Sequence, residues 1–319
     1  MKKKVLLIGG GGTIGTYVAK EMLEKGHMVD IICLENYVSD NENLRYINES
    51  VTYEFLEDLI SKNHYDGIMN LIHYNSPEEY IKVHELLAKN TEHVIVVSSI
   101  RAIGNEQHPI TETAPLIYDL LKDEEYKNKY FNNKYGDFLI NKEFYSLTKA
   151  LIEEYMHNVD TLKNWTIVRP MINTSDKRFD IVTNTFHKVI DYAKEGKEMP
   201  VPEYCRWNVA GLEWAGNTGK MVANIFFNDK CKGQTYNLST AHRMTWDDVA
   251  NIYTSLLGVK FNWIPNEKFE DWSVPIIYDR GYNRDLDNTK LLNDTGLKQE
   301  DFVAFADGVK LELEKVGAI

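Results

Sequence analysis

The 319-residue sequence has few cysteines and an excess of negative over positive charge. Cys33, Cys205 and Cys231 are scattered, with neither metal-ligand spacing nor an even-numbered disulfide framework, so we expect no metal site and a reducing, cytoplasmic location. The 36 Lys and Arg against 48 Asp and Glu give a formal charge of −12. Phosphate-rich partners favour basic faces, so this balance argues against a nucleic-acid or membrane-surface binder.

Long apolar runs, repeats and low-complexity segments are also lacking. Lys2, Lys3 and Lys4 precede an apolar stretch, but glycines interrupt it after Ile8, too soon for the apolar core of a secretory signal. No other stretch is long enough to span a bilayer. With 43% hydrophobic and 26% charged residues, the chain is expected to be globular, with a sizeable core.

Glycine is concentrated near the start of the chain. The strand-like run Val5–Ile8 leads into Gly9–Gly12, and Gly15 follows at the start of a helix-like stretch. Glycines let the backbone approach a pyrophosphate, and a helix N-terminus supplies N–H groups for it, so this pattern predicts a dinucleotide-binding α/β unit. Two spacings, beginning at Gly9 or at Gly10, fit the run, so the glycines alone do not define the kind of Rossmann protein.

Strand-like and helix-like segments alternate through the first half of the chain, which predicts a parallel sheet with helices on both faces. The helices include Pro77–Lys89 and Phe144–Asn158. The further strands are Met28–Leu34, Val51–Phe55, Gly67–Ile72, His93–Ser98 and Trp165–Val168.

The pattern loosens after Arg169 and Pro170, where a second region begins. There, helices Ala215–Phe227 and Trp246–Leu257 flank a strand, Thr235–Leu238, and a helix follows Asp301. We expect an α/β protein of two lobes. Because no flexible linker joins them, the lobes should share an interface, with a ligand between the two.

Tyr145 and Lys149 are four residues apart and so share one face of a predicted helix. Such a pair suits acid–base chemistry: lowering a tyrosine pKa from near 10 to about 7 takes roughly 4 kcal/mol, which an ammonium and an oxidised nicotinamide can supply. The same spacing occurs at Tyr118 and Tyr130, so spacing alone proves little. Tyr145 is favoured because its amphipathic helix runs into the strand that begins at Trp165. The alternative is a packed helix tyrosine beside a solvated lysine.

Ser99 ends a predicted strand at the carboxyl edge of the sheet. There its hydroxyl is placed to donate to a substrate oxygen, although serines often follow strands merely as turn formers. The presence of Tyr145 in the same chain favours the functional interpretation.

Together these residues resemble the extended branch of the short-chain dehydrogenase/reductase superfamily, which contains nucleotide-sugar epimerases and dehydratases. Further matching segments are Pro109–Glu112, Val168–Pro170, Gly233–Leu238 and Asp287–Lys290. The resemblance implies a doubly wound Rossmann domain that binds NAD(P), expected over residues 1–174, and often a homodimer. It also implies a smaller α/β substrate lobe over 175–319, parts of which should pack back onto the first domain. It also implies catalytic roles for Ser99, Tyr145 and Lys149, and cofactor binding by Gly9, Gly12, Thr13, Ile14 and Gly15 together with Tyr145 and Lys149.

Two departures from the family pattern affect what can be expected. The second strand ends at Cys33, where the family usually has an aspartate that binds the adenosine ribose of NAD. Glu35, two residues further on, is able to accept the ribose hydroxyls instead. The family uses a nearby arginine when it binds NADP, and none adjoins Cys33, so we expect NAD rather than NADP. Asp30 lies mid-strand and is expected to be a strand-face residue.

The stretch between Ser99 and Tyr145 is long, with an insertion at about 116–142 that is either a solvated helix and loop or a cover over the active site.

The sequence therefore predicts an NAD-dependent oxidoreductase or epimerase that acts on a secondary alcohol of a sugar-like small molecule, free or nucleotide-linked. The net reaction, whether oxidation, epimerisation or dehydration, stays open. The alternatives are an NADP-dependent ketone reductase and a regulatory protein that senses a dinucleotide without turnover.

Overall fold

The structure is a computed structural model that describes residues 1–104, 107–120, 122–125, 144–182, 186–265, 268 and 280–319. Of the expected insertion at 116–142, residue 121 and residues 126–142 lie outside the described residues.

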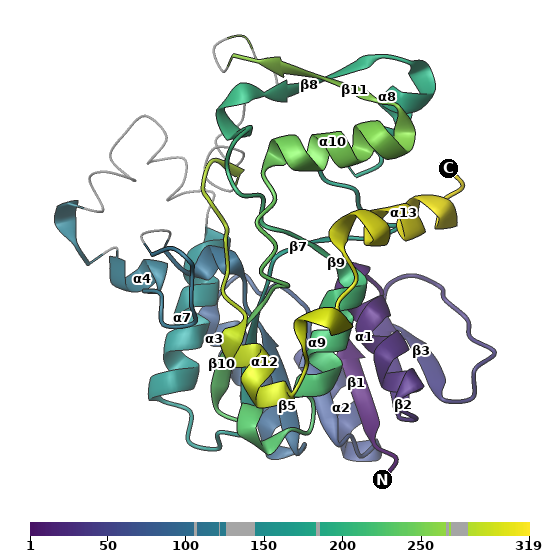
Figure 1. The fold of residues 1–319 in the computed structure, drawn as a ribbon. Coiled ribbons are helices and arrows are strands. Elements are labelled where there is room, and N and C mark those ends of the chain that lie inside the picture. Colours follow the sequence, from purple (N-terminus) through teal and green to yellow (C-terminus); the bar gives the residue numbers. More distant parts are fainter. Residues whose placement is uncertain (105–106, 121, 126–143, 183–185, 266–267, 269–279) are drawn as a thin grey trace.

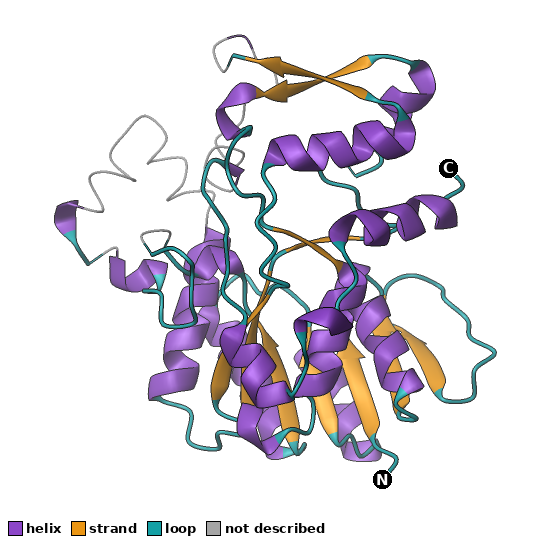
Figure 2. Cartoon of the chain, viewed as in Figure 1, coloured by secondary structure: helices purple, strands orange, loops and turns teal. Residues whose placement is uncertain are grey.

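A seven-stranded sheet in which all neighbouring strands are parallel forms the base of the molecule (Figures 1 and 2). The strand order is β10-β6-β5-β4-β1-β2-β3. The chain adds β2 and β3 on one side of β1 and then crosses to the other side to form β4, so the switch point lies between β1 and β4. In such sheets ligands bind at this switch point, beyond the carboxyl ends of the strands. The bounds are β1 Lys4–Ile8, β2 Met28–Cys33, β3 Leu44–Asn48, β4 Gly67–Asn70, β5 His93–Val97, β6 Trp165–Pro170 and β10 Gln234–Leu238.

Helices cover both faces of the sheet, and the alternation of side chains along β1 explains why. Val5 and Leu7 belong to one hydrophobic cluster, with α1, α9 and α12, whereas Leu6 and Ile8 belong to the other, with α2, α3 and α7. The expected doubly wound α/β fold is confirmed. The helix bounds are α1 Thr13–Glu24, α2 Tyr53–Lys62, α3 Pro77–Lys89, α7 Phe144–Asn158, α9 Ala215–Ile225 and α12 Thr289–Thr295; the short α4, Ile117–Leu120, lies beside α7.

One strand prediction is wrong. The segment Val51–Phe55 contains the start of α2, and the third strand is Leu44–Asn48 instead. Thr52 is the reason, because its hydroxyl accepts a hydrogen bond from the N–H of Phe55 at 3.1 Å and so caps the helix. By contrast, the predicted helices Pro77–Lys89, Phe144–Asn158 and Trp246–Leu257 have the expected bounds.

The chain after β6 contributes both to the layer that contains the large sheet and to a second layer above it. β10 extends the large sheet beside β6, and α9 packs on α1 so closely that a Cβ on Gly219 would lie 2.7 Å from the carbonyl oxygen of Tyr17. The remaining elements form an upper layer around a second core (Figure 1). They are β7 Ile172–Thr174, α8 Lys188–Glu195, β8 Glu198–Pro202, β9 Leu212–Trp214, α10 Trp246–Leu257, β11 Lys260–Ile264 and α13 Phe305–Lys315.

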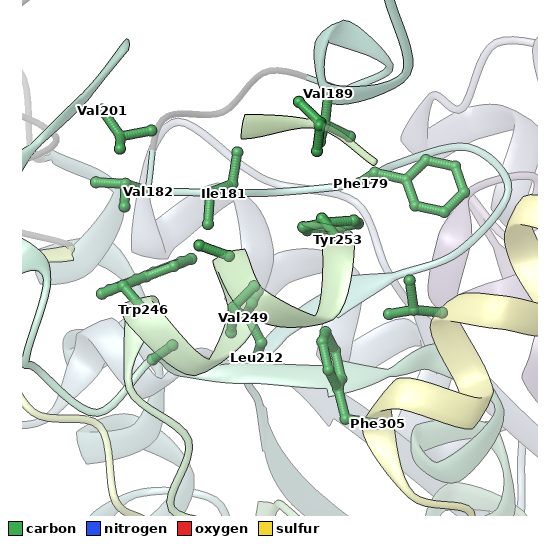
Figure 3. Packing of buried hydrophobic residues seen from close by; sticks show 14 of the residues in the cluster. Phe179, Ile181, Val182, Val189, Val201, Leu212, Trp246, Val249, Tyr253 and Phe305 are labelled. Atoms are coloured by element: carbon green, nitrogen blue, oxygen red, sulfur yellow. The ribbon is translucent and has the colours of Figure 1, made fainter. Parts of the chain in front are cut away.

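The second core is centred on α10. Figure 3 shows Trp246, Val249 and Tyr253 of this helix beside Ile181, in the segment that follows β7. Phe305, at the start of α13, joins the same cluster. Tyr17 of α1 and Ala215 of α9 also belong to this cluster, so apolar packing holds the upper layer to the helices that cover the sheet.

Within the described part of the chain, no helix is both long and apolar enough to cross a membrane, and no group of three His, Cys, Asp or Glu residues is placed to hold a metal ion. The three cysteines are buried and free.

Candidate active site

The glycine loop forms a tight turn between β1 and α1. The N–H groups of Gly9 and Gly10 donate to the Ile32 carbonyl on β2 at 2.9 and 3.1 Å. A Cβ on Gly15 would lie 2.3 Å from the Gly10 carbonyl oxygen, so only glycine fits there, whereas a Cβ on Gly12 would meet no described atom within 4 Å. The loop thus leaves open space in front of the N-terminus of α1, which fits a dinucleotide pyrophosphate.

Polar side chains surround the outer side of this loop. Cys33 ends β2, and a carboxylate oxygen of Glu35 lies 2.9 Å from the place a Cβ on Gly11 would occupy. The Lys177 ammonium donates to the Gly11 carbonyl and lies 3.4 Å from the Tyr37 hydroxyl. Sequence reasoning missed Lys177, because it lies 166 positions after Gly11 and belongs to no motif that would indicate a contact with the glycine loop.

Asp30 is held away from the loop by ion pairs. Its carboxylate lies 3.0 Å from Lys4 Nζ and also pairs with Arg45. Burial tends to raise the pKa of Asp30, but hydrogen bonds from Arg45, Tyr65 and Lys4 outweigh it, so the net shift is downward. The expectation that Asp30 is a strand-face residue is therefore confirmed.

A cavity of about 370 Å³ opens at the carboxyl ends of β5 and β6. Four predicted site residues meet there: Thr13 and Ile14 from the start of α1, Ser99 after β5, and Tyr145 from α7. Gly9, Gly12, Gly15, Glu35 and Lys149 are not among its lining residues. The remaining lining residues are Leu71, Val97, Ser98, Ile100, Arg101, Pro170, Met171, Ile172, Asn173 and Arg178.

Lys149 lies beneath Tyr145, one helical turn along α7. Its ammonium donates to the Val97 carbonyl at 2.7 Å and lies 5.7 Å from the centre of the Tyr145 ring. Burial lowers the pKa of Lys149 to about 8, although the nearby Glu153 carboxylate opposes this. The His73 ring lies 4.9 Å from the Tyr145 ring, and burial together with Lys149 lowers the pKa of His73.

Ser99 begins a single 3-10 turn, Ile100–Ala102, that follows β5. Its Oγ accepts a hydrogen bond from the N–H of Arg101 at 3.2 Å, so the serine O–H is still able to donate elsewhere. The Arg101 guanidinium carbon lies 5.5 Å from the centre of the Tyr145 ring. Sequence reasoning did not select Arg101, and its position two residues after Ser99 was the available signal.

A buried polar network fixes α7 against the sheet below the cavity. Ser98 donates to Glu153 of α7, and Arg169 of β6 forms an ion pair with the same carboxylate at 2.6 Å. Arg169 also donates to the Glu112 carbonyl at 3.1 Å. Both charged groups are almost fully buried, and their mutual hydrogen bonds offset the cost of removing them from water. The network sets the position of Tyr145 relative to Ser99.

A doubly wound sheet with a glycine loop, a serine and a tyrosine–lysine pair at its carboxyl edge defines a dinucleotide-binding α/β protein. The profile of the NAD dependent epimerase/dehydratase family matches residues 5–208. The match covers more than half of the chain, so the chain belongs to that family. This confirms the resemblance seen in the sequence. A comparison with curated protein sequences found no match.

Solved structures share the fold over nearly their whole length at low sequence identity. UDP-glucose 4-epimerase from Thermotoga maritima, solved with UDP-glucose, has a TM-score of 0.71 and 15% identity, with 98% of each chain covered. WbmG from Bordetella bronchiseptica, in complex with NAD and UDP, has a TM-score of 0.71 and 14% identity, with coverage of 100% of this chain and 97% of that one. The Thermus thermophilus UDP-glucose 4-epimerase complex with NAD has a TM-score of 0.68 and 15% identity, with coverage of 99% of this chain and 100% of that one.

Proposed function

We propose that the chain is an NAD-dependent oxidoreductase or epimerase that acts on a secondary alcohol of a sugar-like substrate, free or nucleotide-linked. The observation that carries this proposal is that one cavity is lined by Ser99, Tyr145, Thr13 and Ile14. The cavity brings Tyr145, the candidate base, and Ser99, a hydroxyl donor, to the start of α1, which follows the glycine loop. Family membership and the nucleotide-sugar epimerases among the structural neighbours support the same assignment.

Tyr145 takes the substrate hydroxyl proton in this proposal, and Ser99 donates a hydrogen bond to the same oxygen. The bound nicotinamide would accept the hydride from the carbon. Lys149 favours the tyrosine phenolate, because its ammonium lies 5.7 Å from the ring in a buried setting where charges interact strongly. The hydrogen bond to the Val97 carbonyl keeps this ammonium in place.

We propose NAD as the cofactor, held by the open side of the glycine loop. Glu35, whose carboxylate lies beside Gly11, would accept hydrogen bonds from the ribose diol, and its charge would disfavour the additional phosphate of NADP. Lys177, beside Gly11, supplies a cation for the pyrophosphate. Residues 175–319 would then contribute to the cofactor site as well as to the substrate lobe.

The proposal is tested by titrating NAD⁺ and NADP⁺ against the wild type and Tyr145→Phe. We expect NAD⁺ to bind more tightly than NADP⁺, and the variant to bind NAD⁺ within about twofold of the wild type. Oxidation of a sugar substrate should fall by about a hundredfold or more, since a general base contributes this much. A preference for NADP⁺ would contradict the role of Glu35, and unchanged turnover would contradict the role of Tyr145.

A further inference from the structure

The segment that follows β4 lies between the glycine loop and the proposed base. In the large sheet β4 stands between β1, which leads into the glycine loop, and β5, whose carboxyl end borders the cavity. The N–H of Leu71 donates to the Ile8 carbonyl at 2.9 Å. A Cβ on Gly9 would lie 2.9 Å from Cγ1 of Ile72, so the segment packs against the glycine loop. A dinucleotide that reaches from this loop to Tyr145 therefore crosses the end of β4.

This segment presents the imidazole of His73 to the ring of Tyr145. The two ring centres are 4.9 Å apart, with an angle of 51° between the ring planes. Asn70 fixes the residues on both sides of His73, since its Oδ1 accepts from the N–H of Ile72 at 3.2 Å and its Nδ2 donates to the Tyr74 hydroxyl at 3.0 Å. His73 is therefore held in place beside the base.

A proton on this imidazole has no carboxylate partner, because His73 forms no hydrogen bond or ion pair within the part of the chain that the structure describes. Burial and the charge of Lys149 both lower its pKa. The Arg101 guanidinium carbon lies 5.5 Å from the centre of the same Tyr145 ring. On its other side His73 lines a pocket of about 390 Å³, whose other titratable residues are Glu79 and Lys82 of α3, Tyr53 of α2, and Tyr74.

We propose that His73 is a specificity-determining residue that distinguishes the oxidised from the reduced cofactor: its neutral ring accommodates NAD⁺, whereas its protonated ring favours NADH. Oxidation of an alcohol removes a hydride from the carbon and a proton from its hydroxyl, so the nicotinamide and Tyr145 approach the same group. The inference rests on the proposed function only in taking Tyr145 as the base beside the nicotinamide.

The physical reason is repulsion between like charges. The oxidised nicotinamide carries a positive charge that the reduced ring lacks. A protonated His73 would add a third cation to this charge and to that of Lys149, in a partly buried site where charges interact more strongly than in water. By linkage, a proton that weakens NAD⁺ binding relative to NADH is itself bound more weakly in the NAD⁺ complex, by the same factor.

The test measures the dissociation constants of NAD⁺ and NADH by calorimetry at about pH 7.5 and about pH 5, on either side of the usual histidine range. In the wild type, the ratio of the NAD⁺ constant to the NADH constant should rise by about threefold or more as the pH falls. His73→Phe keeps an aromatic ring and His73→Gln a polar group, but neither side chain titrates, so both variants should lose this rise.

His64→Gln is the matched control, because His64 precedes β4 at the opposite end of the strand and its side chain is 74% exposed. This variant should show the same rise as the wild type. A wild-type ratio that does not change with pH, or a rise that persists in both His73 variants, would overturn the proposal.

An NMR titration of the wild type tests the linkage without a variant. The imidazole signal of His73, assigned through its couplings to the backbone, is followed with pH in each complex. Its pKa should be lower with NAD⁺ than with NADH by about 0.5, which corresponds to the threefold effect on binding. Equal pKa values in the two complexes would refute the coupling.

The reduction of NAD⁺ by a UDP-sugar, measured in parallel, separates this inference from the proposed function. A pH-dependent ratio that needs His73, without any reduction of NAD⁺, would contradict the proposed oxidation and leave the role of His73 standing. Reduction that depends on Tyr145, with a ratio that does not change with pH, would remove the role of His73 alone.

Discussion

Lys149 has an ammonium group almost completely removed from water, and this predicts a pH-dependent stability. Burial lowers its pKa in the folded protein from 10.5 to about 8. Between these pH values the unfolded chain binds the extra proton, so this group makes the folded state more stable as the pH rises from 8 to 10.5. In the cofactor-free protein, the free energy of unfolding of the wild type should rise by about 3 kcal/mol relative to Lys149→Met across this range.

Urea unfolding at several pH values measures this difference. Lys122→Met is the control, since Lys122 lies at the same spacing from Tyr118 but its side chain is 57% exposed. A constant difference between the wild type and Lys149→Met from pH 8 to 10.5 would show that the ammonium is not buried as described.

The sequence predicted the residues of this site that belong to short motifs. Thr13, Ile14 and Ser99 follow predicted strands, and Tyr145 lies at the start of a predicted helix that leads into a strand. These patterns could be identified locally, and the structure brings the four residues to one cavity. Lys177 could not be predicted in the same way, because its contact with Gly11 depends on how the chain folds back after β7.

At the scale of elements, His93 joins β5 to its neighbours through both ring nitrogens. Nδ1 accepts from the N–H of Phe227 at 3.0 Å, so Nε2 carries the proton and bonds Thr166 on β6 at 2.8 Å. Thr166 in turn donates to the Cys231 carbonyl at 2.6 Å. Only the neutral ring can make both bonds, and burial lowers the pKa of His93 to about 3.

This arrangement predicts a loss of stability in acid. As the pH falls from 6.5 towards 3, the unfolded chain gains a proton on this histidine that the folded protein does not bind. The free energy of unfolding of the wild type should then fall relative to His93→Gln by about 1.4 kcal/mol per pH unit. Thermal unfolding at several pH values measures this, with the exposed His64→Gln as the control. Parallel pH profiles of wild type and His93→Gln would refute it.

Elements with strong local signals were predicted with the correct bounds, and the error came where two signals competed. Pro77–Lys89 has Pro77 in its first turn and a serine cap, so its start is defined by the sequence. Val51–Phe55 is rich in strand-forming residues, but the cap at Thr52 starts a helix there. The strand prediction took account of the β propensity of these residues and overlooked Thr52 as a helix cap.

At the scale of the whole molecule, Glu312 of the C-terminal helix α13 connects the two layers. Its carboxylate accepts hydrogen bonds from the Tyr17 hydroxyl on α1, from Trp214 Nε1 at 2.7 Å, and from the N–H of Asp176 at 2.8 Å. Asp176 directly precedes Lys177, so the same carboxylate also positions the cation beside the glycine loop. Although burial tends to raise the pKa of Glu312, these bonds, with a further one from Lys315, outweigh it and lower the pKa.

Glu312→Gln should therefore destabilise the protein by about 2 kcal/mol, because the amide turns an N–H donor towards groups that are donors themselves. The lowered pKa gives the wild type stability that is lost as the pH falls through the carboxyl pKa, and the variant should lack this acid-dependent part. NAD⁺ affinity should fall as well, through Lys177. Glu314→Gln, exposed on the same helix, is the control. A fully stable Glu312→Gln protein with unchanged NAD⁺ affinity would contradict this account.

The contribution of the later chain to the Rossmann layer was expected only in outline. β10 pairs with β6 across more than 60 residues of sequence, and α9 packs on α1 through Gly219. These contacts depend on complementary surfaces that are far apart in the chain. The sequence therefore predicted that parts of the second region pack back, without identifying the contacting surfaces.

The most direct test of the central claim is the absorbance of reduced nicotinamide in a single turnover of the NAD-loaded protein with an excess of a UDP-sugar. The wild type and Tyr118→Phe, which removes a tyrosine at the same spacing from a lysine, should both form reduced cofactor at the same rate. Tyr145→Phe should form it about a hundredfold or more slowly while it binds NAD⁺ normally. Equal rates for Tyr145→Phe and the wild type would contradict the assignment of this cavity as the site of tyrosine-dependent oxidation.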